Sequence, residues 1–198
     1  DSVFSLCRKA GGRTAAISYS WMSELYSRAP YVSDRDRVQL DAEGSIQYGM
    51  YYWDDNYPDS HVFAEGECLR KTFDPDFMLY HTMAVDEWGH MKGADSAEYA
   101  NAVAAVGHLI AARMPEWLEK GYQVVVTADH GMNNLGIHVG TEYAQREVAL
   151  YIFSDKVENG RFEENYISQL NVAPLVCKLM GVPATEGMKQ ELEIVFSK

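Results

Sequence analysis

The stretch "VVVTADHGMNN" (residues 124–134) changes within a few positions from apolar to strongly polar. Its first part, 124–127, is β-branched throughout and is typical of a strand. A strand this apolar favours a sheet that is covered on both faces, as parallel sheets in α/β proteins are. Asp129 and His130 follow at once, and Gly131 permits a sharp turn. The polar pair would then lie at the carboxyl edge of the sheet, where such proteins bind ligands.

Other segments of the chain fit the same architecture. Apolar runs predict further strands at 14–20, 76–83 and 147–153, beside the strand at 122–129. Helical spacing predicts helices at 2–10, 93–121 and 171–183. Strands that alternate with helices predict an α/β fold with a mostly parallel central sheet, covered by helices on both faces.

The expected helices carry recognisable start and stop signals. Asp1 or Ser2 can cap the first helix. Asp95, with a glutamate three residues on, resembles a capping box for the second, and Pro115 should kink or shorten it. In the last helix Asn171 caps the start, Pro174 falls in the first turn and Gly181 ends the helix.

Residues 31–72 differ in character from the rest. They combine a charged stretch with "QYGMYYWDDNYPDS" (47–60), which crowds Tyr, Trp and Asp around glycine and proline. We interpret 31–72 as a small cap or insertion within a single domain that covers residues 1–198. Its aromatic rings could stack on a substrate ring, although packing within an irregular loop is the commoner use.

Composition excludes several classes of function. The net charge of −12 argues against a nucleic-acid surface. No apolar run approaches the roughly 20 residues that a membrane span needs. The cysteines Cys7, Cys68 and Cys177 lie far apart, which favours reduced thiols and a cytoplasmic location. The sequence starts at Asp1 rather than Met, so we expect the domain to be incomplete at its N-terminus and a removed signal stays open.

Three polar clusters follow predicted strands or lie close to them. Asp86 and His90 are four residues apart in "VDEWGHM", Asp129 and His130 are adjacent, and His138 lies in "LGIHVG". Carboxylate and imidazole ligands suit Zn²⁺, and also Mn²⁺. Five such ligands suggest two ions, which together often serve phosphoryl transfer. Two divalent ions against two carboxylates would make the site locally positive, so an anionic substrate is compatible with an acidic protein.

The combination of "VDEWGHMKG", "VVVTADHGM" and "GIHVG" resembles the alkaline phosphatase superfamily. The resemblance extends to "YYWDDNYPDSHVF", "DSAEYANAV" and "NVAPLVCKLMGVP", and it is greatest to the type I phosphodiesterase / nucleotide pyrophosphatase branch. That branch implies an alkaline phosphatase-like fold and two ions, usually zinc. It further implies hydrolysis of phosphodiester or nucleotide pyrophosphate bonds through a Ser or Thr nucleophile. A small phosphorylated molecule, such as a nucleotide, is the implied substrate.

Carried over by motif, the resemblance assigns Asp86, His90 and His138 to one ion, and Asp129 and His130 to the other. The family's nucleophile and first metal-binding aspartate lie upstream of the motif that matches residues 2–10. We therefore expect the 198 residues alone to be inactive or nearly so. A second departure is "HVG", where many relatives have His-Gly-Gly, because Val139 takes a positive φ only at a cost.

Other interpretations remain open on the sequence. Within the superfamily the reaction could be that of a phosphomonoesterase, a sulfatase or a phosphomutase, and outside it the chain could be a non-catalytic metal-binding domain. The remaining histidines have simpler explanations: His81 fits a core position with a backbone hydrogen bond, His61 fits a loop, and His108 fits an exposed helix face. The oligomeric state is not encoded in any recognisable pattern.

Overall fold

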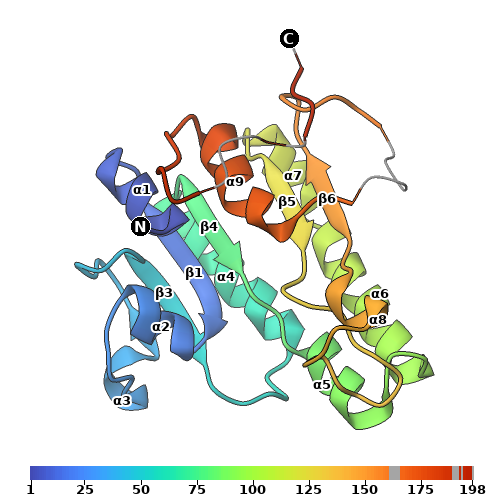
Figure 1. Ribbon diagram of the computed structural model, residues 1–198. Coiled ribbons are helices and arrows are strands. Elements are labelled where there is room, and N and C mark those ends of the chain that lie inside the picture. The colour runs from blue at the N-terminus through green and yellow to red at the C-terminus, as the bar shows by residue number, and fades with distance from the viewer. Residues whose placement is uncertain (161–165, 189–191, 193, 198) are drawn as a thin grey trace.

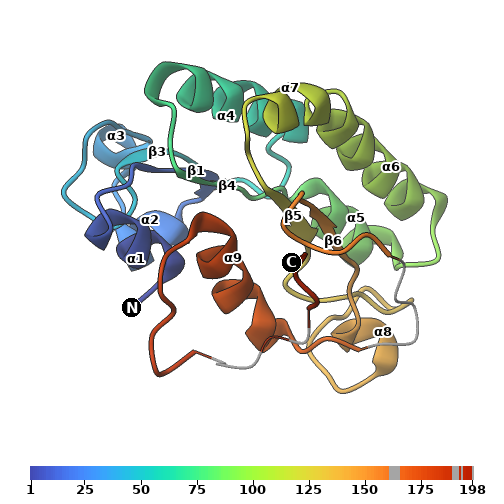
Figure 2. The ribbon, with the colours of Figure 1, turned by 90° about the horizontal axis from the view of Figure 1, so that it is seen from above.

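A computed structural model describes residues 1–160, 166–188, 192 and 194–197. A sheet forms the middle layer, and helices lie over both of its faces (Figures 1 and 2). The helices are α1 (Val3–Lys9), α2 (Trp21–Tyr26), α3 (Ser33–Asp36), α4 (Asp59–Phe73), α5 (Ala84–Lys92), α6 (Ala97–Ala111), α7 (Met114–Glu119), α8 (Tyr143–Arg146) and α9 (Val172–Met180). The strands are β1 (Thr14–Tyr19), β2 (Val38–Gln39), β3 (Tyr48–Tyr52), β4 (Phe77–Tyr80), β5 (Val124–Thr127) and β6 (Leu150–Phe153). The predicted α/β class is confirmed.

The central sheet is built around β1. Its order is β2-β3-β1-β4, with β3 and β4 parallel to β1 and β2 antiparallel at the edge. Ala16 lies opposite Gly49 on one side and Leu79 on the other. Residues 14–18 are fully covered, because β1 has a strand on each side and helices on both faces. The mostly parallel central sheet predicted from the sequence is present.

Alternate residues of β1 enter two apolar clusters on opposite faces of the sheet. Ala16 packs with Phe4 of α1 and Met22 of α2. Ile17 faces the other way and packs with Val62 of α4. Figure 2 shows the same division, with α1, α2 and α9 on one face and α4, α6 and α7 on the other.

The helix starts agree with the sequence in one case and differ in another. Ser2 caps α1 in a capping box, since its hydroxyl accepts from the amide of Ser5 at 3.1 Å and the Ser5 hydroxyl accepts from the amide of Ser2 at 2.8 Å. The predicted capping box at Asp95 is wrong. Ser96 caps α6 instead, and its hydroxyl accepts from the Tyr99 amide at 3.1 Å, because the helical backbone begins one residue later than the motif suggested.

The helix predicted over 93–121 is divided into α6 and α7. Pro115 lies in the first turn of α7, where its missing amide costs no helical hydrogen bond. The predicted interruption by this proline is confirmed. At the other end of the chain, α9 ends at Gly181 in the left-handed conformation, as expected. Asn171 does not cap that helix through its side chain, which donates to the carbonyl of Ser168.

β5 and β6, which the sequence predicted as strands of the mostly parallel sheet, lie outside the central sheet. They pair antiparallel, with Val125 opposite Ile152, in a separate two-stranded sheet. A parallel return needs a crossover, usually a long helix. The connection between the two strands holds only the short α8 and is otherwise occupied by the loop that carries His138.

Most of residues 31–72 belong to the layers of the domain and not to a cap. β3 pairs with β1 in the middle of the sheet, and α4 packs against one face of it. The cap interpretation is therefore wrong for 48–72. Tyrosines and glycine, which suggested an irregular loop, are here strand residues, and Tyr51 and Tyr52 are buried.

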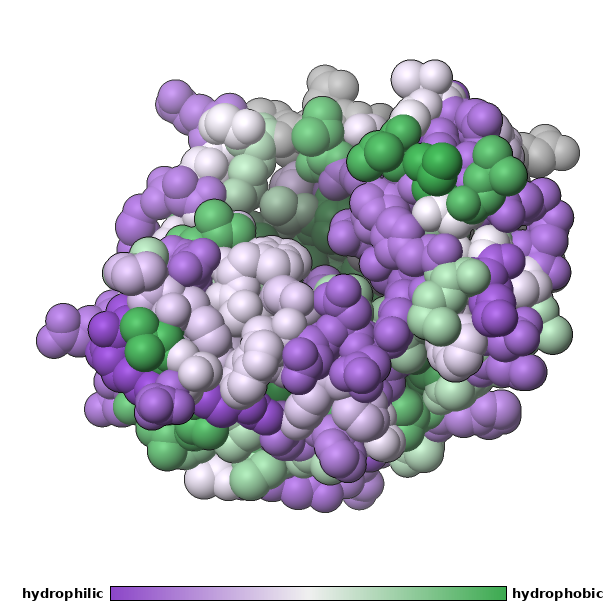
Figure 3. All heavy atoms as spheres, turned by 90° about the horizontal axis from the view of Figure 1, so that it is seen from below, coloured by the Kyte–Doolittle hydropathy of each residue, from purple (hydrophilic) through white to green (hydrophobic). Residues whose placement is uncertain are grey.

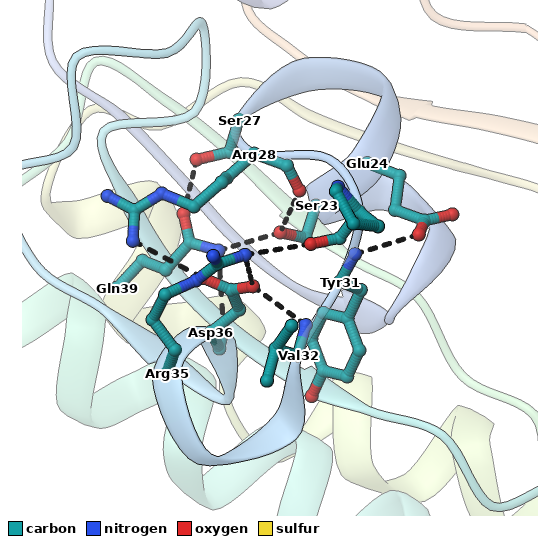
Figure 4. A network of polar contacts seen from close by, with 10 residues as sticks. Ser23, Glu24, Ser27, Arg28, Tyr31, Val32, Arg35, Asp36 and Gln39 are labelled. Atoms are coloured by element: carbon teal, nitrogen blue, oxygen red, sulfur yellow. Dashed lines mark hydrogen bonds and ion pairs between the residues drawn. The ribbon is translucent and has the colours of Figure 1, made fainter.

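The part of this segment before β3 is fixed by a buried polar network around Asp36, shown in Figure 4. The Asp36 carboxylate is fully buried and accepts from Nε and Nη2 of Arg35 at 2.8 and 2.6 Å and from the amide of Val32 at 2.8 Å. The Arg35 hydrogen bonds lower the pKa of Asp36. Gln39 of β2 donates to Ser23 of α2 at 2.6 Å, which links the edge strand to the helix layer.

Two further observations concern the length of the helices and the reactivity of the thiols. Among the helices described, none is long and apolar enough to cross a membrane. Cys7, Cys68 and Cys177 are free thiols, and Cys7 and Cys177 are buried. Burial raises the pKa of Cys7 to about 11, which keeps it protonated and unreactive.

Glu67 of α4 connects its helix with β4 and α7. Its carboxylate accepts from Arg70 on the same helix at 2.9 and 2.7 Å, from Tyr80 of β4 at 2.9 Å and from the indole of Trp117 in α7 at 2.7 Å. Burial by itself would raise the pKa of Glu67, but these hydrogen bonds outweigh it and lower the pKa to about 2. The ionised form therefore stabilises the contact of α4 with β4 and α7.

We expect Glu67→Gln to lower the free energy of unfolding at pH 7 by on the order of 3 kcal/mol, because the folded pKa lies about two units below its ordinary value. Since the folded pKa is depressed, this contribution is present above about pH 4.5 and is lost as the pH falls towards 2. Urea unfolding of both proteins as a function of pH measures it. Glu119→Gln, an exposed change in α7, should stay within about 0.5 kcal/mol. A pH-independent difference for Glu67→Gln would contradict the interpretation.

Candidate metal centre

Helix α5 presents the first pair of predicted ligands. It begins shortly after β4, so Asp86 lies in its first turn at the carboxyl edge of the sheet. Asp86 and His90 are one turn apart and share a helix face. The Nε2 atom of His90 is 3.5 Å from Oδ2 of Asp86.

The residues that follow β5 approach the same helix face. Nε2 of His130 lies 3.8 Å from Oδ1 of Asp86 and 3.6 Å from Oδ2 of Asp129. His138 stacks on His130, with ring centroids 3.7 Å apart and planes at 12°. Its ring is also 5.0 Å from that of His90. All five predicted ligands thus lie around one point at the carboxyl ends of β4 and β5.

A turn organised by Asn133 holds the loop that carries His138. The side-chain oxygen Oδ1 of Asn133 accepts from the backbone amides of Leu135 and Ile137 at 3.0 and 2.9 Å. Its side-chain nitrogen Nδ2 donates to the carboxylate of Glu142 at 3.0 Å. Gln145 donates to the carbonyl of Ile137 at 3.1 Å. These contacts show that the Asn133 side chain serves the turn.

Two glycines allow the loop to approach its neighbours closely. A Cβ on Gly131 would lie 2.1 Å from the carbonyl oxygen of Ala144, and one on Gly136 would lie 2.6 Å from that of His90. Gly136 also has φ +72°, which disfavours other residues. Val139 is not among the described non-glycine residues with positive φ, so the expected strain at that position is not found.

Backbone carbonyls orient two of the histidines. Nδ1 of His90 is 2.8 Å from the oxygen of Gly136, and Nδ1 of His130 is 3.0 Å from that of Gly131. Because a carbonyl can only accept, Nδ1 carries the proton in each ring, and Nε2 keeps a lone pair. This is the arrangement by which metal-binding histidines are normally fixed.

One carboxylate oxygen supports a cation at this point. Oδ1 of Asp86 is buried and has no hydrogen-bond partner among the residues that the structure describes. The atoms by which Asp86, His90 and His138 could bind a metal ion lie within 4.8 Å of one another. A buried carboxylate oxygen without a partner is costly unless a cation compensates its charge. The residues therefore fit a divalent ion, and they are the three that the resemblance assigns to one ion.

The second pair of predicted ligands, Asp129 and His130, includes a side chain that is largely exposed to solvent. The Asp129 side chain is 73% exposed, and its carboxylate accepts only from the adjacent amide of His130, at 3.1 Å. Within the described residues, no third His, Cys, Asp or Glu joins this pair in a group with metal-ligand spacing. The assignment of Asp129 and His130 to a second ion stays a prediction, and it needs further ligands.

His81 lies beside the centre in a different role. Its Nδ1 is 2.9 Å from the hydroxyl of Tyr52, which donates to the His81 carbonyl at 2.7 Å. Burial lowers the pKa of His81, although the nearby carboxylates act against it. The partner of the ring is thus a tyrosine and not the backbone group expected from the sequence. His108 is exposed on α6 as expected, whereas His61 lies on α4 and not in a loop.

Asp59 is a residue of the site region that sequence reasoning missed. It is buried at the start of α4, and its carboxylate accepts from the amides of Met83 and Ala84 at 3.1 and 3.4 Å. These amides begin α5, which has no side-chain cap of its own. Asp59 thus supplies the cap from another helix and fixes the turn before Asp86. No local motif could have shown this, because the partners are more than 20 residues apart.

The fold and the ligand cluster agree with the comparison to known families. Residues 4–173 match the type I phosphodiesterase / nucleotide pyrophosphatase family, and the chain belongs to that family. This family lies within the alkaline phosphatase superfamily.

Curated relatives place the chain beside named transferases. It is 27% identical over 157 residues to the catalytic subunit of GPI ethanolamine phosphate transferase 3 of Mus musculus, covering 75% of this chain and 14% of that protein. The human counterpart is 29% identical over 115 residues, covering 57% and 10%. GPI ethanolamine phosphate transferase 2 of Schizosaccharomyces pombe is 24% identical over 132 residues, covering 57% and 17%. The chain spans less than a fifth of the length of these relatives.

A solved structure shows a more distant likeness. Murine ectonucleotide pyrophosphatase / phosphodiesterase 5, in an inactive form in complex with AMP, matches with a TM-score of 0.45 and 18% identity. The match covers 66% of this chain and 32% of that one.

We expect Asp86→Asn and His90→Ala each to weaken zinc binding by more than about tenfold, because even groups that only orient ligands contribute about 10–100-fold. Calorimetric titration against a competing chelator measures the affinity. His108→Ala is the matched control, since it removes an imidazole from an exposed face of α6. An unchanged affinity in the first two variants would exclude these residues as ligands.

We also expect Asp59→Ala to reduce zinc affinity by about three- to tenfold, since a lost helix cap costs on the order of 1 kcal/mol and here frees the turn that holds Asp86. Asp59→Asn keeps one acceptor oxygen and should retain most of the affinity. The same titration distinguishes them. Equal losses in both variants would show that the charge of Asp59, and not its cap, matters.

Proposed function

We propose that the intact protein is a metal-dependent enzyme that cleaves phosphodiester or nucleotide pyrophosphate bonds, with two divalent cations at the centre described above. Zn²⁺ is the first choice and Mn²⁺ the second. In this proposal Asp86, His90 and His138 hold one cation, and Asp129 and His130 contribute to the other. The substrate is a small phosphorylated molecule.

The unpartnered Oδ1 of Asp86 is the observation that carries the proposal. Nε2 of His130 lies 3.8 Å from this oxygen, Nε2 of His90 lies 3.5 Å from the other oxygen of the same carboxylate, and the ring of His138 stacks on that of His130. In their neutral form, the two histidines whose Nδ1 faces a backbone carbonyl keep a lone pair on Nε2. Buried carboxylate oxygens are normally paired with a donor, and imidazoles that could share a cation with this one lie next to it. The family membership supports phosphoryl transfer at the same place.

The residues of the chain have distinct parts in the proposed reaction. When bound, two divalent ions would stabilise the charge on the phosphoryl oxygens and lower the pKa of the attacking oxygen. The partial exposure of His90 and Asp129 leaves room for a substrate next to the ligands. The half-buried ring of His81 lies beside them, with its Nδ1 2.9 Å from the hydroxyl of Tyr52.

The nucleophile and the missing ligand of the second cation lie, in this proposal, outside residues 1–198. The pair Asp129 and His130 supports this, since the described residues supply it with no third ligand. The chain alone would then bind one cation better than two and would turn over substrate poorly.

We expect residues 1–198 with added zinc to hydrolyse a chromogenic phosphodiester at no more than the rate of buffer containing zinc, while still binding the metal. The rates for a phosphomonoester and a sulfate ester are measured alongside, with residues 1–198 and with a longer form of the protein. Activity of the longer form on either ester would favour a phosphomonoesterase or a sulfatase. Clear diesterase turnover that His90→Ala abolishes would overturn the proposed absence of the nucleophile.

Transfer to an alcohol is the second candidate, favoured by the relatives named as ethanolamine phosphate transferases. Attack by water on the phosphorylated nucleophile releases a phosphate monoester, whereas attack by an alcohol forms a new phosphodiester. Reaction of the intact protein in H₂¹⁸O with an added alcohol separates the two by product mass.

A native polypeptide that starts at Asp1 by intact-mass measurement would instead favour a non-catalytic metal-binding domain.

A further inference from the structure

The loop that carries His138 has little apolar packing to hold it. Residues 139–144 are exposed, and so are 146 and 147. The loop lies at the end of the molecule where the strands have their carboxyl ends, and the surface at this end is hollowed near its middle (Figures 1 and 3). An exposed loop is mobile unless hydrogen bonds fix its backbone. The position of His138 therefore depends on the polar contacts of the loop.

Gln145 is the buried residue of the segment 139–147. It is 5% exposed, although the residues on either side of it are exposed. Both ends of its side-chain amide are paired: Oε1 accepts from the backbone amide of Glu142 at 3.1 Å, and Nε2 donates to the carbonyl of Ile137 at 3.1 Å. Since a backbone amide only donates and a carbonyl only accepts, a single orientation of the Gln145 side-chain amide satisfies both partners.

These two contacts enclose His138. Ile137 precedes the histidine and Glu142 follows it, so the side chain of Gln145 connects the two ends of the loop. Gly140 lies against the same side chain, because a Cβ at this glycine would be 2.3 Å from Oε1 of Gln145. The backbone on both sides of His138 is thus placed by one buried amide.

The other contacts of the loop are more exposed. The turn at Asn133 accepts from the backbone before the histidine, and it reaches the other side through the carboxylate of Glu142, an exposed residue. Nε of Arg146 donates to the carbonyl of Thr141 at 2.9 Å, and both of these residues are exposed. Water competes with exposed hydrogen bonds, so the buried amide of Gln145 contributes more to the geometry of the loop.

The main chain of Gln145 extends this role to a second histidine. Its carbonyl accepts from the amide of Gly131, directly after His130, at 2.9 Å. The carbonyl of the same glycine lies 3.0 Å from Nδ1 of His130. One residue therefore holds the backbone beside both His130 and His138, whose rings stack with centroids 3.7 Å apart and planes at 12°.

We propose that Gln145 is a positioning residue that sets the separation of His130 and His138. This inference rests on the proposed function, in which the two histidines belong to different cations. Their ring separation of 3.7 Å is similar to the spacing of about 3.5–4 Å between the ions of two-metal sites, which lets both ions contact one phosphoryl group. Gln145 is not itself a ligand and acts through the backbone that carries both rings.

Nuclear magnetic resonance of the intact protein with ¹³C- and ¹⁵N-labelled histidine tests the positioning. An excess of chelator makes the result independent of metal, and His130→Ala and His138→Ala assign the ring signals. We expect a nuclear Overhauser contact between the two rings and upfield-shifted ring protons. Gln145→Met fills a similar volume but pairs with neither Ile137 nor Glu142, so it should lose both signals. A ring contact that survives in Gln145→Met would overturn the proposal.

Gln47→Met is the matched control for the loss of a buried glutamine. Gln47 is 8% exposed, and its side chain accepts from Arg8 at 2.5 Å and donates to Asp41 at 2.8 Å. It directly precedes β3, at the end of the sheet away from the metal centre. Gln47→Met and Gln145→Met should both lower the urea midpoint of unfolding, but the ring contact should be lost in Gln145→Met alone. Its loss in both variants would show a general effect of destabilisation and overturn the proposal.

Gly140→Ala is a second variant, which keeps the test valid if Gln145→Met does not fold. It leaves Gln145 in place but puts a methyl group where Oε1 lies, and it does so in an exposed loop. We expect the ring contact to be lost again. Gly107→Ala is the control, because a Cβ at this position meets no atom within 4 Å. An unchanged ring contact in Gly140→Ala would contradict the enclosure of the loop by Gln145 and overturn the proposal.

Zinc titration against a competing chelator separates this inference from the proposed function. We expect Gln145→Met to weaken zinc binding by about tenfold or more, as the loss of groups that orient ligands does, and Gln47→Met to leave it unchanged. An unchanged zinc affinity in Gln145→Met that has lost the ring contact would overturn the inference. If the natural protein binds no zinc while the ring contact still depends on Gln145, the positioning of the histidines stands and the proposed function falls.

Discussion

The close packing of α5 against the loop after β5 is the constraint on which the candidate site depends. Gly136 approaches the carbonyl of His90 in α5 more closely than a Cβ would allow, and the amide of Ala94 donates to the carbonyl of Asn133 at 3.1 Å. The Gly136 carbonyl, brought close in this way, accepts from Nδ1 of His90, and the carbonyl of Gly131, adjacent to His130, accepts from Nδ1 of that histidine. The packing of the backbone thus determines which ring nitrogens face the carboxylates.

The centre is arranged at a cost to the protein without a cation. Asp86 places a buried carboxylate oxygen among imidazoles without a hydrogen-bond donor, and His130 and His138 stack so closely that charging both would be repulsive. The carboxylates of Asp36 and Glu67, by contrast, each accept from an arginine and from further donors. Functional sites are where such rules are broken in native proteins.

The sequence predicted the parts of the fold that depend on local pattern. Apolar runs located β1, β4, β5 and β6, and the three polar clusters identified residues that meet in space. It failed where a distant partner decides the outcome. The direction of β6 depends on what its connection must carry, the strand character of 48–52 depends on pairing with β1, and the cap on α5 comes from Asp59 of another helix. None of these leaves a periodic signal.

The candidate centre lies across the interruption between the two sheets. Asp86 and His90 follow β4 of the larger sheet, whereas Asp129, His130 and His138 follow β5 of the smaller one. Among the described residues, side chains and the backbone hydrogen bond from Ala94 to Asn133, and not a strand ladder, join the two parts at this edge. A cation bound by ligands from both parts would therefore stabilise their relative placement, because its binding free energy becomes folding free energy when no preformed site exists in the unfolded chain. Metal affinity and the integrity of the sheet are in this way coupled.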